Sequence, residues 1–167
     1  MSDGRGEIHR EIFIAAPRDV VFDFLVNPSL MVAWIGISHD LDPRSGGIFR
    51  IEVSHGNVAR GRYVEVSPPR RVAFTWGWET HDPSSAVLGE LPPESSLVEI
   101  DLEPANGGTV VRLRHSGLPS TLSKIHGERW MHYLGRLDGA ARDAAGRQVF
   151  VGVMTPEGGG EGGNPNA

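Results

Sequence analysis

Hydrophobic and polar residues alternate through most of the middle of the chain, which is the pattern of strands with one buried face. The pattern predicts strands at residues 7–14, 46–53, 58–66, 70–78, 96–103 and 109–116. Turn residues between the later strands predict antiparallel neighbours. A sheet with one apolar face must be covered by a second layer of structure.

Apolar residues at helical spacing predict helices between the first two strands and after the last one. Pro17 stands where a helix can begin, Pro28 ends that helix, and a short second helix follows at about 28–34. A long helix begins at Pro119 and runs to about Ala145. This helix is long enough to cross the sheet, and a curved sheet wrapped around it leaves a space between the two.

The long helix carries one apolar stripe and three glycines. The stripe consists of Leu122, Ile125, Trp130, Leu134, Leu137 and Ala141. Gly127, Gly135 and Gly139 weaken the helix locally, and we expect them to permit close approach to the sheet.

The strand at about 70–78 is unusually aromatic. At period two it places Val72, Phe74, Trp76 and Trp78 on one face. Two indoles and a phenyl ring exceed what a small core needs, and buried indole N–H groups need hydrogen-bond partners. The pattern suggests the lining of an internal pocket for a small molecule, and the alternative is that Trp34, Trp76, Trp78 and Trp130 are core residues.

The strand at 58–66 alternates poorly, because Arg60 and Arg62 share a parity with Val64 and Val66. Either a bulge resets the register or the arginines point inward at one end. Inward arginines would suit an anionic ligand group. We favour solvated or paired arginines, since arginine is rarely buried alone.

The last two strands form the clearest hairpin, around a turn at 105–108. Folding about this turn lays Asp101 near Arg112 and Glu99 near Arg114. Such pairs contribute roughly 0.2–1 kcal/mol each and mainly fix the register of the strands. We therefore interpret the charged runs as a solvated sheet face.

The chain of 167 residues is of a length that indicates one domain. We expect a flexible N-terminus at 1–6, a single domain at 7–146, an extension of uncertain structure at 147–154, and a disordered Gly-rich tail at 155–167. A polar, proline-containing loop is expected at 80–94.

Composition narrows the range of partners. The net charge of −5 argues against nucleic acid or anionic membrane as the main partner, since both select basic surfaces. The sequence has no cysteine, which excludes disulfides, thiolate metal sites and cysteine nucleophiles. It shows no apolar signal core at its start and no apolar run near the ~20 residues that span a bilayer, so we expect a cytoplasmic protein.

Six blocks in this order resemble the START-related (SRPBCC) superfamily, and within it the group named after the activator of Hsp90 ATPase. The blocks are Ala16-Pro17 after the first strand, Asn27-Pro28 with Trp34, Gly46 to Phe49, Gly61 to Pro69, Phe74-Thr75-Trp76, and Val111 to Pro119 continued by His126 to Leu134. The resemblance covers about residues 7–145.

The resemblance implies an α+β helix-grip (Bet v 1-like) fold, in which a curved antiparallel sheet wraps around a long C-terminal helix. It also implies a cavity between them, often for an apolar ligand. Relatives in this superfamily bind lipids or hormones, cyclise polyketides, or act as co-chaperones. We expect no co-chaperone N-terminal module in this chain, which disfavours Hsp90 activation.

The histidines raise two chemical possibilities. The seven are scattered, and only His126 and His132 share an element, six residues apart on different helix faces, so we expect no metal site and no cofactor. His115 and His126 face the predicted cavity and are candidate general acids or bases. The alternative, which we favour, is a hydrogen-bonded core histidine, because no paired acid or nucleophile is evident.

Three functional hypotheses follow. The first is a binding protein for an apolar or aromatic small molecule, and the second is a cyclase, dehydratase or hydrolase using His115 or His126. The third is a chaperone-related interaction module with an exposed apolar patch near 149–151. The expected ligand-binding residues are Trp34, Phe49, Phe74, Trp76, Trp78, Leu113, His115, His126, Trp130 and Leu134.

Overall fold

The computed structural model describes residues 5–81 and 91–154, and the side chains of 6–81 and 91–147. The strands are β1 (Arg5–Ile14), β2 (Ser38–Leu41), β3 (Ile48–Ser54), β4 (Asn57–Ser67), β5 (Arg71–Trp76), β6 (Trp78–Thr80), β7 (Ser96–Ala105) and β8 (Gly108–Pro119). The helices are α1 (Arg18–Val26), α2 (Pro28–Met31) and α3 (Ser120–Met154).

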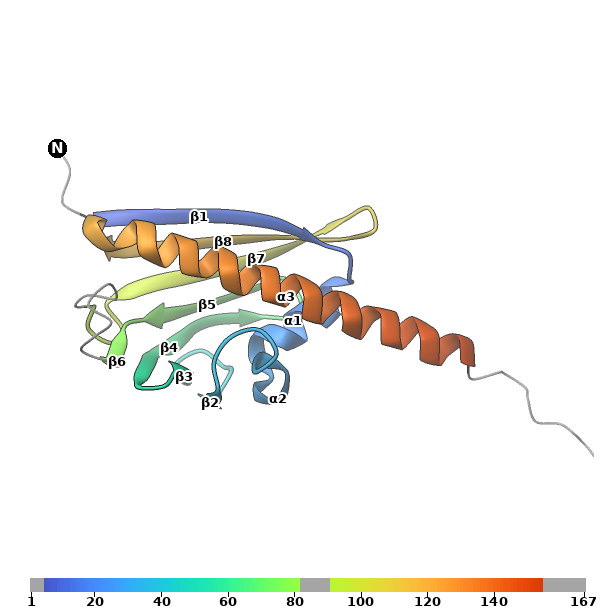
Figure 1. Ribbon diagram of the computed structural model, residues 1–167, viewed down its shortest axis with the longest axis horizontal. Helices are drawn as coiled ribbons and strands as arrows, with labels where there is room; N and C mark the ends of the chain where they lie inside the picture. The colour runs from blue at the N-terminus through green and yellow to red at the C-terminus, as the bar shows by residue number, and fades with distance from the viewer. Residues whose placement is uncertain (1–4, 82–90, 155–167) are drawn as a thin grey trace, which may run out of the picture.

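The strands form one antiparallel sheet in the order β1-β8-β7-β5-β4-β3-β2, with β6 paired to β4. Figure 1 shows α3 crossing the sheet as a long diagonal, with α1 packed beside it and α2 next to α1. The apolar faces of sheet and helix meet in a single buried core. The α+β helix-grip architecture expected from the sequence is confirmed.

Both short helices begin as the sequence predicts. Pro17 is the N-cap of α1, and the Asn27 side chain caps α2 by accepting the backbone N–H of Ser29 across 2.9 Å. Pro28 occupies the first turn of α2, where its missing N–H costs nothing. This helix ends at Met31, earlier than expected, and Trp34 lies in the turn that follows.

The aromatic strand is broken at Gly77 into β5 and β6, which the alternation did not predict. A Cβ atom on Gly77 would lie 1.7 Å from the carbonyl oxygen of Pro92, so only glycine lets these backbones approach. The next residue, Trp78, donates its backbone N–H to the carbonyl oxygen of Leu91 across 2.6 Å. The segment before β7 therefore holds the end of the aromatic strand in place.

A bulge resets the register of β4, which was one of the two alternatives left open. The pairing of β4 with β5 shifts between Tyr63 and Glu65. Arg60 and Arg62 consequently lie on the outer face, where they form ion pairs with Glu79 at 3.3 Å and Glu94 at 3.4 Å. These two arginines do not reach the interior.

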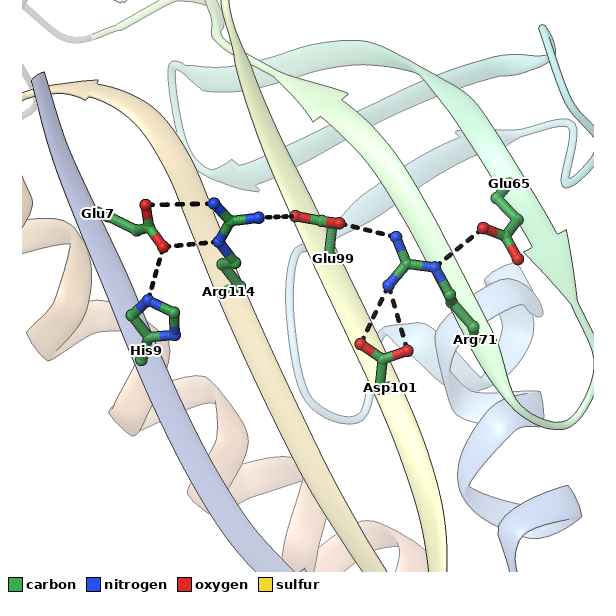
Figure 2. Close-up of polar contacts among 7 residues, drawn as sticks. All are labelled: Glu7, His9, Glu65, Arg71, Glu99, Asp101 and Arg114. Atoms are coloured by element: carbon green, nitrogen blue, oxygen red, sulfur yellow. Dashed lines mark hydrogen bonds and ion pairs between the residues drawn. The ribbon is translucent and has the colours of Figure 1, made fainter.

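The outer face of the sheet carries a continuous charge network (Figure 2). Arg114 bonds Glu7 and Glu99, and Glu99 also accepts from Arg71 across 2.7 Å. Arg71 also forms ion pairs with Glu65 and Asp101, so three carboxylates surround its guanidinium. The hydrogen bonds that Arg71 donates to these carboxylates, that to Glu99 foremost, raise the pKa of Arg71. The predicted register of the hairpin is confirmed, with Glu99 opposite Arg114 and Asp101 opposite Arg112.

Of the three glycines on α3 that were expected to approach the sheet, only Gly127 does so. A Cβ on Gly127 would lie 2.5 Å from a guanidinium nitrogen of Arg10 on β1, whereas Gly135 and Gly139 have no atom within 4 Å of that position. The expectation of close approach was therefore right for Gly127 and wrong for the other two. The helix continues beyond Ala145 to Met154 and includes the stretch left unassigned from sequence.

Four expectations fall wholly or partly outside what the structure describes. They concern residues 1–4 of the expected N-terminal segment, residues 82–90 of the expected loop, the side chains of 149–151, and the tail at 155–167. Within the described part of the chain, no helix is long and apolar enough to cross a membrane.

Candidate ligand site between the sheet and α3

The aromatic residues of three strands and α3 converge in the interior. Phe49 on β3 stacks on Phe74 on β5 with ring centroids 3.9 Å apart and planes at 12°. Trp76 follows on β5, and its indole lies 5.5 Å from that of Trp78 and 5.4 Å from that of Trp130 on α3. The period-two pattern thus placed the aromatic side chains on the correct face.

His115 on β8 lies at the centre of this group with no exposed surface. Trp130 donates its indole N–H to His115 Nδ1 across 3.0 Å. Because an indole only donates, Nδ1 accepts and Nε2 carries the proton of a neutral ring. Nε2–H then donates to Ser96 Oγ across 2.8 Å, and Ser96 Oγ donates to the Trp76 carbonyl oxygen across 2.8 Å.

His126 on α3 has the opposite tautomer. Its Nδ1 lies 3.0 Å from the carbonyl oxygen of Leu122, which only accepts, so Nδ1 carries the proton. Nε2 is left to accept the indole N–H of Trp78 across 3.3 Å. Each histidine therefore takes the N–H of one tryptophan, and both rings are neutral.

Burial disfavours the charged forms of both rings. It lowers the pKa of His115 to about 3, and the neighbouring His126 adds to the effect. Burial also lowers the pKa of His126, against the bond to the Leu122 carbonyl oxygen, which raises it. With both nitrogens occupied, His115 has the arrangement of a hydrogen-bonded core histidine, whereas His126 borders a small cavity.

The cavity has a volume of ≈ 20 Å³ and lies beside α3. Its walls are Ile35, Val53, Trp76, Trp78, His126, Arg129, Trp130 and Tyr133. A cavity must offer roughly 10–15 Å³ to hold one water, so this one accommodates a single water in the observed conformation. Side chains fill most of the space in which a larger pocket was expected.

The predicted site residues separate into two groups. Four of them line the cavity: Trp76, Trp78, His126 and Trp130. Six lie in the surrounding core without lining it: Trp34, Phe49, Phe74, Leu113, His115 and Leu134. Trp34 is the most separate of these, since its indole N–H bonds the carbonyl oxygen of Phe24 across 2.8 Å.

Sequence reasoning missed four wall residues. Ile35 follows Trp34 in the sequence, and Val53 has the same parity as Phe49 on its strand. Arg129 and Tyr133 lie three and seven residues after His126, which is the spacing of one helix face. That spacing was the available signal for both, although an arginine on an apolar face is seldom interpreted as a wall residue.

Two wall residues carry buried N–H groups that lack partners within the part of the chain that the structure describes. These are the Nε1–H of Trp76 and the Nε–H of Arg129. The hydroxyl of Tyr63, deeper in the core, also lacks a partner there. For metal binding, the described residues contain no group of three or more His, Cys, Asp or Glu side chains that could hold an ion.

A family model described as Activator of Hsp90 ATPase homolog 1-like protein matches residues 15–142. The chain belongs to this family. The match spans α1 through most of α3 and includes every wall residue of the cavity. A search among curated proteins found no significant match.

Solved structures share the fold. An AHSA1-like protein from Rhizobium etli is 40% identical with a TM-score of 0.64, and the match covers 83% of this chain and 82% of that one. The Aha1 dimer from Colwellia psychrerythraea is 16% identical with a TM-score of 0.65, covering 82% and 96%. A protein from the dynemicin biosynthetic locus is 20% identical with a TM-score of 0.67, covering 90% of this chain and 49% of that one.

Proposed function

We propose that this chain binds one small apolar or aromatic molecule between β5, β6 and α3. The observation that carries the proposal is the aromatic wall, in which Trp76, Trp78 and Trp130 border an internal cavity. A core that needed only to be filled would be served by aliphatic side chains, which bring no N–H groups to satisfy. An indole wall is suited to stacking on a flat or extended apolar ligand.

Ligand entry requires that the wall move. Sites for drug-sized molecules measure about 300–1,000 Å³, far more than the ≈ 20 Å³ observed. Arg129 and Tyr133 are only half-buried, whereas Trp76, Trp78 and Trp130 are buried. Outward rotation of the two half-buried side chains enlarges the cavity without breaking the core, so they form the expected mouth.

The test is intrinsic tryptophan fluorescence during titration with fatty acids, flavonoids and polyketide-like aromatics. A ligand in the cavity should give a saturable change that is reduced in Trp76→Phe and Trp78→Phe. Trp34→Phe is the matched control, because its indole bonds Phe24 outside the cavity wall. A panel without any saturable response, or a response lost only in Trp34→Phe, would contradict the proposal.

A second candidate is an enzyme acting in the same cavity with His126 as acid or base. Its support is that His126 lines the cavity and that its Nε2 is held by one long contact of 3.3 Å to Trp78. The fold similarity to a protein from the dynemicin biosynthetic locus is compatible with it. Turnover of a bound polyketide-like aromatic, lost in His126→Gln with binding retained, would favour this candidate over simple binding.

A further inference from the structure

Three of the four indole N–H groups have a hydrogen-bond acceptor among the described residues, and the fourth does not. Trp34 donates to the Phe24 carbonyl oxygen, Trp78 to His126 and Trp130 to His115. Trp76 is 3% exposed and borders the cavity, yet its N–H has no acceptor within the described chain. A buried donor without an acceptor is unfavourable, and native proteins rarely keep one without a purpose.

Arg129, a wall residue on α3, also has a buried N–H group without an acceptor among the described residues. The arginines on the outer face of the sheet are paired with carboxylates, as Arg71 and Arg114 illustrate. None of the ion pairs between described residues includes Arg129, and its buried Nε–H lacks an acceptor there. One half-buried cation thus faces an apolar cavity in a chain of net charge −5, where acids for pairing are abundant.

The side chains of the cavity wall supply mainly donors, and besides His126 the one group among them that can accept is the Tyr133 hydroxyl, which can also donate. The aliphatic members of the wall, Ile35 and Val53, offer neither, and the acceptor nitrogen of His126 is occupied by Trp78. A ligand that satisfies this wall must bring oxygen atoms that accept from an indole and a guanidinium. A guanidinium matches a carboxylate in geometry and charge.

We propose that the ligand of this site is an apolar or aromatic carboxylate whose anionic group accepts from Trp76 Nε1–H and Arg129. This inference rests on the proposed function and specifies its ligand class. The ring or chain of the ligand packs on the indoles of Trp78 and Trp130, while the carboxylate lies toward the mouth, beside Arg129. The occupant thereby neutralises the unpaired cation and satisfies the unpaired indole.

The test compares 4-phenylbutanoate, 4-phenylbutanamide and 4-phenylbutan-1-amine by titration calorimetry. These probes share one apolar body and differ in the charge of the head group. We expect the carboxylate to bind about tenfold or more tightly than the amide, since hydrogen bonds to charged groups are the stronger ones. The amine should bind more weakly than the amide.

Variants connect the preference to the wall. Arg129→Gln should reduce the affinity for 4-phenylbutanoate about tenfold or more, and should reduce the affinity for the amide much less, because the lost interaction is mainly with the charge of the carboxylate. Arg136→Gln is the matched control, because Arg136 is an exposed residue of the same helix outside the cavity wall. Both positions are at least partly solvated, so neither variant is expected to unfold the protein.

The outcomes separate this inference from the proposed function. Equal affinity for carboxylate and amide, or a carboxylate preference that survives Arg129→Gln, overturns the inference and leaves binding in the cavity intact. Failure of all three probes to bind at millimolar concentration overturns both. A carboxylate preference that is lost in Arg129→Gln and kept in Arg136→Gln supports both.

Discussion

Trp130 on α3 donates its indole N–H to Nδ1 of His115 on β8 across 3.0 Å, inside a largely apolar interior. The bond ties the helix to the sheet and selects one tautomer of a fully buried ring. Through Ser96 the same ring reaches the backbone of Trp76, so one polar chain links α3, β8, β7 and β5. This chain holds the aromatic wall of the candidate site in register.

The stability of the protein should fall as the pH drops from ~6.5 to ~5. In the folded state the pKa of His115 is lowered from 6.5 to about 3, and that of His126 is lowered as well. Between those values the unfolded chain binds more protons than the folded one, so stability is present above the unfolded pKa and lost below it. Each histidine contributes a slope of up to about 1.4 kcal/mol per pH unit.

Urea unfolding at several pH values measures this slope. The carboxyl groups of Glu7, Glu65 and Glu79 have lowered pKa values, so they change the free energy of unfolding only below about pH 5. The interval above pH ~5 therefore reports the buried histidines. His132→Gln, at an exposed position, is the control that should leave the slope unchanged. A free energy of unfolding that stays constant over this interval would contradict the neutral, buried assignment.

Ser96→Ala should destabilise the protein by roughly 1–3 kcal/mol, because it leaves the Nε2–H of His115 buried without an acceptor. The Trp76 carbonyl oxygen loses its side-chain donor at the same time. Ser95→Ala is the neighbouring control, since the Ser95 hydroxyl makes an exposed bond to the Pro92 carbonyl oxygen. Chemical denaturation that gives the two variants equal stability would refute the proposed role of Ser96.

Arg71→Met should cost roughly 1–3 kcal/mol, between the values for exposed and buried ion pairs. The Arg71 side chain is 21% exposed, and its removal takes away the cation that Glu65, Glu99 and Asp101 share. Thermal unfolding should show the loss, and added salt should reduce it. Arg142→Met removes a solvated pair with Asp138 on α3 and should have a much smaller effect. Equal losses would mean that the network is only surface charge.

Gly135→Ala and Gly139→Ala should each stabilise the protein by roughly 0.5–1 kcal/mol, because alanine restricts the unfolded chain and no atom crowds the added methyl group. Gly127→Ala should gain less, since its Cβ would displace the Arg10 guanidinium. The midpoint of thermal unfolding reports both effects. A lowered midpoint in Gly135→Ala would show that the glycine serves a contact or motion absent from this structure.

Local patterns predicted what depends on neighbours in sequence. Alternation and a tight turn placed Glu99 opposite Arg114 correctly, because both signals act within one hairpin. The break at Gly77 was missed, since its cause is the backbone of Pro92, which reaches β6 only in the folded chain. The bulge in β4 was recognised as an alternative, and pairing with β5 decided it.

The candidate site was predicted in part for the same reason. Alternation along the strand predicted Trp76 and Trp78 as wall residues. On the long helix, His126 and Trp130 were predicted, whereas Arg129, which lies on the same helix face, was not. The remaining volume of ≈ 20 Å³ depends on how side chains interlock across the sheet and helix. Sequence periodicity reports which face a side chain takes, and it does not report whether the facing layers leave a space.

The most direct test of a ligand site between β5, β6 and α3 is the ¹H–¹⁵N spectrum of the four indole N–H groups during titration with 4-phenylbutanoate. We expect saturable shifts of the Trp76, Trp78 and Trp130 signals, the largest at Trp76, while the Trp34 signal stays in place. Unmoved signals at the three wall tryptophans, or a shift confined to Trp34, would contradict it.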